Sequence, residues 1–233
     1  MSSSSRAFFR LSSPRAALVG SEARFSPVSD DHRDGVASPA RRACLGLLAL
    51  SAIGLSGCDR PPAPKTYGHD VSGAKFGSDF SLKDPAGNTR TLADFKGQIV
   101  MMFFGFTQCP DICPTALFRA AEIKRMLGKD ARRLQILFVT LDPERDTPEV
   151  LQAYAKAFDA DVVPLYGDAE QTRQVAKTYN VFYQKVPTGS SYTMDHSSTT
   201  YVYDTQGRIR VLFKHEQPAE ECASDIRQLL AEA

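Results

Sequence analysis

The chain has 233 residues, of which 42% are hydrophobic and 24% are charged, and its formal net charge is +1. This length accommodates one domain and a leader, and the composition is that of an ordinary globular protein. The balanced charge argues against a nucleic-acid partner and against a strongly acidic one.

Residues 1–40 are predicted to be disordered. They are rich in Ser, Arg and Ala and show no sustained hydrophobic periodicity. Such a composition buries too little apolar surface to order the chain. The alternative is a translation start placed upstream of the true one.

Residues 41–58 are predicted to be an export signal of the lipoprotein type. Two arginines precede the apolar run 43–55, which is shorter than the ~20 residues that a membrane span needs. A basic flank, a short apolar core and small residues at the end describe an export signal, with a buried core helix as the alternative. The ending LSGC resembles the lipobox of bacterial lipoproteins, in which Cys58 is acylated. We therefore expect a lipid anchor in the inner membrane and a domain in the bacterial periplasm.

The stretch 59–70 contains three prolines and predicts a stiff tether to a domain of residues 71–233. Three cysteines, Cys109, Cys113 and Cys222, would remain in an oxidising compartment. One close pair and one single cysteine do not form a disulfide framework. They predict a thiol site and a buried small side chain.

The first part of the domain predicts a hairpin, a strand and a helix. Residues 80–82 and 89–92 flank the turn DPAGN, which indicates a β-hairpin. The continuous apolar run 98–106 predicts a strand at the centre of a sheet. After the cysteines, the stretch TALFRAAEIKRML repeats apolar residues at helical spacing, so we expect a helix from Pro114.

The later part of the domain repeats this order. It predicts a buried strand at 134–141, a capped helix from Pro148 and a helix with a capping box at 168–179. A hairpin at 199–213 and a last helix from Pro218 follow. Strands alternating with helices predict an α/β sandwich with a mixed sheet.

The two close cysteines, Cys109 and Cys113, follow the first central strand. Proline disfavours a helical conformation in the residue before it, so Cys113 is expected at the helix entrance, with Cys109 in the loop upstream. The positive end of the helix would lower the pKa of both thiols. A thiolate serves both disulfide attack and metal binding, and the Cys-x-x-x-Cys spacing allows either. Among metals, soft thiolates select Cu(I), zinc or iron–sulfur clusters.

A third ligand is sought among four histidines. His32 lies in the leader, His69 in the tether, and His215 after a strand end, where a solvated residue is expected. His196 lies just before the predicted strand at 199. A lone histidine in such a place is ordinarily a hydrogen-bonded polar residue. The thiol pair makes His196 the candidate third ligand.

Three motifs resemble those of the Sco (SenC) family: FFGFTQCPDICPTAL at 103–117, TLDPERDTP at 140–148 and DHSSTTYVYD at 195–204. The resemblance implies a thioredoxin-like fold and a copper chaperone that assembles the dinuclear copper centre of respiratory oxidases. It implies that Cys109, Cys113 and His196 bind copper. It also implies that the two cysteines cycle between dithiol and disulfide.

Two aspartates are expected around the site rather than on the metal. Asp195 is expected to orient the imidazole, with a turn residue as the alternative. Asp142 belongs to a motif in which Arg145 is expected to pair with Asp142 or Asp146 and Thr147 to cap a helix.

Two further residues concern the ligand set. Met194 is the one thioether close enough to His196 in the sequence to be tested as a ligand. Gln108 stands where members of the family often carry histidine, so a fourth nitrogen ligand is not expected there.

Two functions remain open, besides a thiol peroxidase, which is less favoured because its single reactive cysteine would not require His196. The first is a copper-binding assembly factor that receives copper from an upstream donor and serves the copper-bearing subunit of an oxidase. The rival is a thiol–disulfide oxidoreductase that reduces cysteines of that subunit. A generic thioredoxin-like enzyme carries a proline before its next-to-last strand, where this chain has serines after His196. We therefore expect a metallochaperone, with weak thiol redox activity at most, rather than an enzyme.

Overall fold

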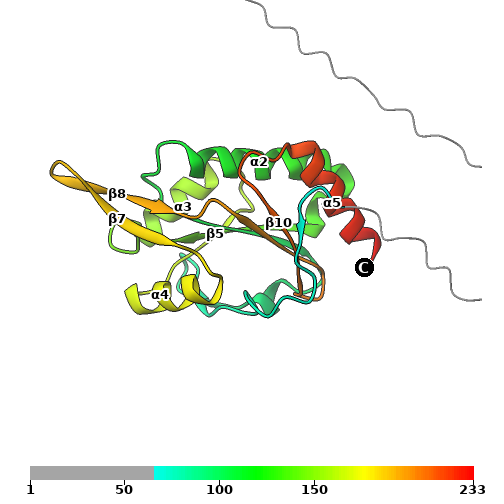
Figure 1. Cartoon of the computed structure of the whole chain (residues 1–233), viewed down its shortest axis with the longest axis horizontal. Coiled ribbons are helices and arrows are strands. Elements are labelled where there is room, and N and C mark those ends of the chain that lie inside the picture. Colours follow the sequence, from blue (N-terminus) through cyan, green and yellow to red (C-terminus); the bar gives the residue numbers. More distant parts are fainter. Residues whose placement is uncertain (1–65) are drawn as a thin grey trace, which may run out of the picture. The chain divides into compact units, whose positions relative to one another are not determined.

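The computed structural model describes residues 66–233 of the chain (Figure 1). The leader 1–40, the export signal 41–58 with Cys58, and residues 59–65 of the expected tether lie outside this part. Within the described part, no helix is both long enough and apolar enough to span a membrane.

A six-stranded mixed sheet forms the centre of the domain, in the order β1-β10-β9-β4-β5-β6. Its strands are β4 (Ile99–Gly105), β5 (Leu134–Thr140) and β6 (Val163–Leu165), which are parallel to one another, and β9 (Thr200–Tyr203), β10 (Ile209–Phe213) and β1 (His69–Asp70) on the other side of β4. Every residue of β4 is buried, as its continuous apolar run predicts.

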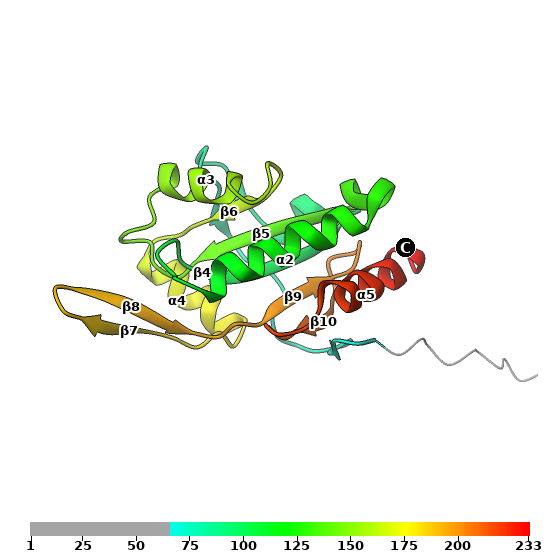
Figure 2. The ribbon, with the colours of Figure 1, turned by 90° about the horizontal axis from the view of Figure 1, so that it is seen from above.

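Four α-helices lie on the two faces of the sheet: α2 (Ile112–Met126), α3 (Pro148–Lys156), α4 (Ala169–Thr178) and α5 (Ala219–Ala231). In the view of Figure 1, α2, α3 and α5 lie above the sheet and α4 lies below it. Figure 2 shows α2 and α5 side by side across the sheet. The predicted α/β sandwich with a mixed sheet is confirmed.

The caps predicted from the sequence define two helix starts. The Thr147 hydroxyl accepts a hydrogen bond from the N–H of Val150 at the start of α3, and Asp168 and Gln171 form the capping box of α4. Helix α2 begins at Ile112, two residues before the expected start at Pro114. Proline is tolerated there because the first turn of a helix leaves its N–H groups without intrahelical partners. Cys113 therefore lies within the first turn.

Two hairpins were predicted and a third was not. The turn DPAGN joins β2 (Leu82–Lys83) to β3 (Thr89–Arg90), and β9 joins β10 as expected. The unexpected hairpin joins β7 (Tyr183–Thr188) to β8 (Ser191–His196) and forms a separate two-stranded sheet. It projects beyond the end of the central sheet in Figure 2.

The first described residues are held against β10 and α5. Asp225 of α5 is fully buried, and its carboxylate accepts hydrogen bonds from the N–H groups of Tyr67 (2.9 Å) and Gly68 (2.8 Å). A Cβ at Gly68 would lie 2.4 Å from the Cγ1 of Val211, so only glycine fits there. Residues 66–70, expected in the tether, thus belong to the folded domain.

Candidate metal centre

The two thiols lie where β4 ends and α2 begins. Cys113 is fully buried and Cys109 is partly buried. The N–H of Cys113 donates to the Cys109 sulfur at 3.4 Å. A Cβ at Gly105 would lie 2.6 Å from the Cys113 sulfur, so the absence of a side chain on β4 makes room for this thiol.

The carboxylate of Asp146 holds the thiol loop to β5. It accepts hydrogen bonds from the hydroxyls of Thr107 (2.6 Å) and Thr140 (2.5 Å) and from the N–H of Thr107 (3.1 Å). Asp146 is 1% exposed, and burial raises the pKa of its carboxyl. The start of the thiol loop is therefore fixed from inside the domain.

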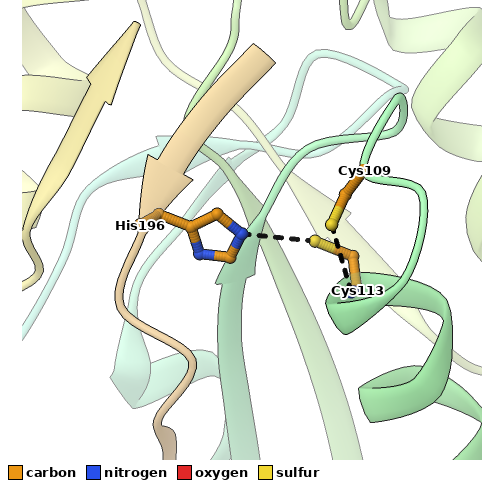
Figure 3. Close-up of side chains that lie close together, drawn as sticks. All are labelled: Cys109, Cys113 and His196. Carbon is orange, nitrogen blue, oxygen red and sulfur yellow. Dashed lines mark hydrogen bonds between the residues drawn. The ribbon is translucent and has the colours of Figure 1, made fainter. Parts of the chain in front are cut away.

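The imidazole of His196 comes from the last residue of β8 and points at the thiols (Figure 3). Its Nε2 lies 3.6 Å from the Cys113 sulfur, and its Nδ1 lies 2.9 Å from the carbonyl oxygen of Ser197. Because a carbonyl can only accept, this contact assigns the proton to Nδ1 and leaves Nε2 free as a ligand. The imidazole ring makes T-shaped contacts with the rings of Phe103 and Phe106.

The ligand atoms of Cys109, Cys113 and His196 all lie within 4.8 Å of one another. Two ligands on one ion, each with a bond of ~2.0–2.3 Å, can be separated by up to ~4.6 Å. A small closing movement therefore suffices for all three atoms to reach the same ion. Two sulfurs and one imidazole nitrogen suit a thiophilic transition metal such as copper or zinc.

The pKa values of the two thiols are shifted in opposite directions. A hydrogen bond from the Cys113 thiol, with further ones from backbone N–H groups, lowers the pKa of Cys109 to about 3. The same hydrogen bond, together with burial, raises the pKa of Cys113. Ionisation of the reduced pair is therefore favoured at Cys109, the more exposed of the two sulfurs. The expectation that the helix end lowers both values is wrong for Cys113, because its burial and its neighbouring thiolate oppose ionisation.

The predicted roles of the two aspartates have different outcomes. Asp195 is exposed, and successive strand residues point to opposite faces, so its side chain leaves the face that carries His196. The contact expected from Asp195 is made by the carbonyl of Ser197. Asp142 is 1% exposed and pairs with Arg145, so of the two aspartates expected as partners of Arg145 the structure selects this one.

The remaining residues considered for the site are Met194, Gln108 and Cys222. Met194 is 6% exposed and lies two residues before His196 on β8, so a ligand role for it stays a prediction. The side-chain oxygen of Gln108 accepts a hydrogen bond from Arg145 (3.1 Å). Cys222 is fully buried, as predicted, and burial raises its pKa to about 12.

Two residues at the site escaped the sequence analysis. Gly105 interrupts an apolar strand, and a glycine in such a pattern signals close approach of another group. Tyr192 lies in the unexpected hairpin, and its hydroxyl donates to Asp142 (2.8 Å). Nothing in the sequence near Tyr192 distinguishes it from any other strand tyrosine.

The chain matches the SCO1/SenC family model over residues 69–231. It is 38% identical over 157 residues to the mitochondrial protein SCO2 homolog of Bos taurus, an alignment that covers 66% of this chain and 59% of the bovine protein. It is 40% identical over 150 residues to a SCO2-like protein of Rickettsia felis, covering 63% of this chain and 73% of that protein. The chain therefore spans less than two thirds of the bovine relative.

The fold is similar to that of Bradyrhizobium japonicum ScoI, solved with copper bound. The two are 39% identical with a TM-score of 0.61, and the match covers 67% of this chain and 99% of ScoI. This likeness confirms the predicted thioredoxin-like fold. The family match runs from the first residue of β1 to the last residue of α5, and the chain belongs to the SCO1/SenC family.

Proposed function

We propose that this chain binds copper and serves the assembly of the dinuclear copper site of a respiratory cytochrome oxidase. The convergence of Cys109, Cys113 and His196 within 4.8 Å carries this proposal. The Sco family is involved in copper binding and in cytochrome c oxidase assembly, and the similar ScoI was solved with copper bound.

Copper is cargo in this function, and each ligand has a distinct part. The two thiolates would hold Cu(I) as soft donors, and the imidazole would add a third bond that also suits Cu(II). Cys113 must lose its proton for this, so copper binding is expected to release a proton. Three protein ligands leave a position at which a ligand of the recipient subunit can enter. The partly exposed Cys109 marks the side from which this ligand would approach.

A second candidate is a thiol–disulfide oxidoreductase that reduces cysteines of the same subunit. It is favoured by the low pKa of Cys109, since a thiolate is the form that attacks a disulfide. Cys113, four residues later in the first turn of α2, would then resolve the mixed disulfide. In this function the imidazole that points at Cys113 would serve only as a proton acceptor for the resolving thiol, whereas copper binding requires it as a ligand.

Copper titration of the reduced chain tests the ligand set. The wild type is expected to bind a single copper, and Cys109→Ala and Cys113→Ala to lose it. His196→Ala should weaken Cu(II) binding far more than Cu(I) binding. An unchanged Cu(II) affinity and unchanged sulfur-to-copper absorption in His196→Ala would overturn the assignment. Equal insulin reduction by wild type and His196→Ala, at thioredoxin-like rates, would favour the oxidoreductase.

The cellular location of the domain and its membrane anchor are also part of the proposal. The LSGC sequence supports acylation of Cys58 and a periplasmic domain anchored to the inner membrane as a lipoprotein. Two or more acyl chains give a stable anchor, since each buried CH₂ contributes ~0.8 kcal/mol. Cys58→Ser should therefore move the chain from the membrane fraction to the soluble fraction. Retention of that variant in the membrane would exclude this anchor. An upstream copper donor or thiol reductant completes the proposed partners.

A further inference from the structure

The hairpin that carries His196 has no strand pairing with the central sheet. Strands β7 and β8 pair only with each other within residues 66–233, and five of the six residues of β7 are exposed. An isolated two-stranded hairpin is marginally stable in water. Contacts other than strand pairing must therefore set the distance between the imidazole and the thiols.

The guanidinium of Arg145 touches both halves of the site. Its Nη1 donates to the carbonyl oxygen of Tyr192 on β8 (2.7 Å) and to the side-chain oxygen of Gln108, the neighbour of Cys109 (3.1 Å). Its Cζ lies 3.7 Å from the centre of the Tyr192 ring. The Arg145 side chain is 16% exposed, so these contacts are largely shielded from water.

The carboxylate of Asp142 completes the group. One oxygen accepts from the hydroxyl of Tyr192 (2.8 Å), and the other accepts from the Nε of Arg145. Charge-assisted hydrogen bonds between buried partners are stronger than neutral ones. Loss of one partner is costly because it leaves the other charge buried and uncompensated. Tyr192 lies four residues before His196 on the same strand, so both side chains leave the same face.

We infer that Arg145 is a positioning residue that holds the His196 hairpin against the thiol loop through Tyr192, Asp142 and Gln108. The inference rests on the proposed copper-binding function. Loosening the hairpin would raise the free-energy cost of bringing three ligands onto one ion. Binding by the two thiolates alone would be less affected, because Cys113 is buried and Asp146 holds the loop that carries Cys109.

The chain offers a matched control at the surface. Glu144 and Lys185 form an ion pair (2.6 Å) that joins the same two segments, but their side chains are 62% and 43% exposed. Exposed ion pairs of this kind contribute little to stability. Glu144→Gln therefore removes a link between the same segments without disturbing the buried group.

Copper affinities of Arg145→Lys and Tyr192→Phe test the inference. Each is expected to lower Cu(II) affinity by about tenfold or more and to shift the sulfur-to-copper absorption, as outer-shell changes at metal sites do. Cu(I) affinity should change less, and Glu144→Gln should match the wild type. Equal losses for Cu(I) and Cu(II) in both variants would overturn the inference. Tyr192→Phe keeps the ring and changes one hydroxyl, so it covers the case in which Arg145→Lys fails to fold.

A double-mutant cycle separates positioning from general stability. If Arg145 acts through His196, Arg145→Lys should cost no further Cu(II) affinity in the His196→Ala background. An equal loss in both backgrounds would contradict the role. Amide exchange in the copper-free protein gives an independent measure, with β8 expected to exchange faster in Arg145→Lys than in Glu144→Gln. Amide exchange can be measured even if the wild type binds no copper. A failure of the proposed copper function can therefore be distinguished from a failure of the positioning role of Arg145.

Discussion

The thiol half and the imidazole half of the site are built differently. The thiols follow a strand that is buried at every position, and Asp146 fixes their loop from inside the domain. The imidazole ends a hairpin that is largely exposed and lies outside the central sheet. Two of the proposed ligands are therefore positioned from inside the domain, whereas the third depends on the polar contacts of its hairpin and on the rings of Phe103 and Phe106.

Amide hydrogen exchange should reveal this difference most strongly. Amides of β4 and β5 are expected to exchange only on global unfolding, whereas those of β7 and β8 open locally because little apolar surface holds them. The hairpin amides should exchange at least about a hundredfold faster. Similar protection of the two regions would show that the hairpin is as firmly held as the core.

Gly105→Ala should disturb the thiol half directly. The added methyl would lie 2.6 Å from the Cys113 sulfur and 3.0 Å from the Phe138 ring. Overpacking of this kind costs about 1–3 kcal/mol, and displacement of the sulfur should lower affinity for both copper states. Thermal unfolding and copper titration measure the two effects.

Gly68→Ala is the control for that variant. Its methyl would lie 2.4 Å from the Cγ1 of Val211, on the β10 side of the sheet. We expect a similar loss of stability with copper affinity unchanged. Equal copper affinities in Gly105→Ala and the wild type would show that the glycine is not needed for the thiol geometry.

Alkylation of the reduced, metal-free chain should be nearly independent of pH. The lowered pKa of Cys109 keeps its thiolate as the pH falls, until the pH approaches about 3. The iodoacetamide rate at Cys109 should therefore stay flat from about pH 8 to about pH 5, where an ordinary thiol loses its reactivity. Mass spectrometry of the modified site checks the assignment. A tenfold fall per pH unit in this range would show an ordinary thiol.

Asp195→Asn should have the smallest effect. The Asp195 carboxylate is exposed, and the proton on Nδ1 of His196 is directed at the carbonyl of Ser197. Cu(II) affinity should change by less than about threefold, as for most surface substitutions. A loss as large as that of Tyr192→Phe would restore Asp195 as the residue that orients the imidazole.

Local signals predicted most of the fold. The apolar runs that became β4 and β5, the caps of α3 and α4, and the turn residues of two hairpins act over a few residues and are visible in the sequence. Strand β6 and the β7–β8 hairpin were missed because they are short or exposed and lack alternating apolar residues. Burial by the rest of the domain, rather than local preference, defines β6.

The sequence predicted which three residues form the site, but it did not predict how their side chains are positioned. Cys-x-x-x-Cys and the later histidine come together through pairing of β4 with β9, which joins residues about a hundred positions apart. The partner of the imidazole is a backbone carbonyl, which every residue possesses, so no sequence pattern marks it. Arg145 was expected to pair with an aspartate, but its contacts to Tyr192 and Gln108 depend on the hairpin's position.

The buried carboxylate of Asp225 makes the last helix dependent on the first residues of the domain. A shortened protein beginning at Val71 would lack the two N–H donors that Asp225 accepts and would leave β10 as an uncovered edge. Such a fragment is expected to be less stable and more prone to self-association than one that retains Thr66 onward. Soluble versions of this protein should therefore be cut within the proline-rich stretch upstream of Thr66.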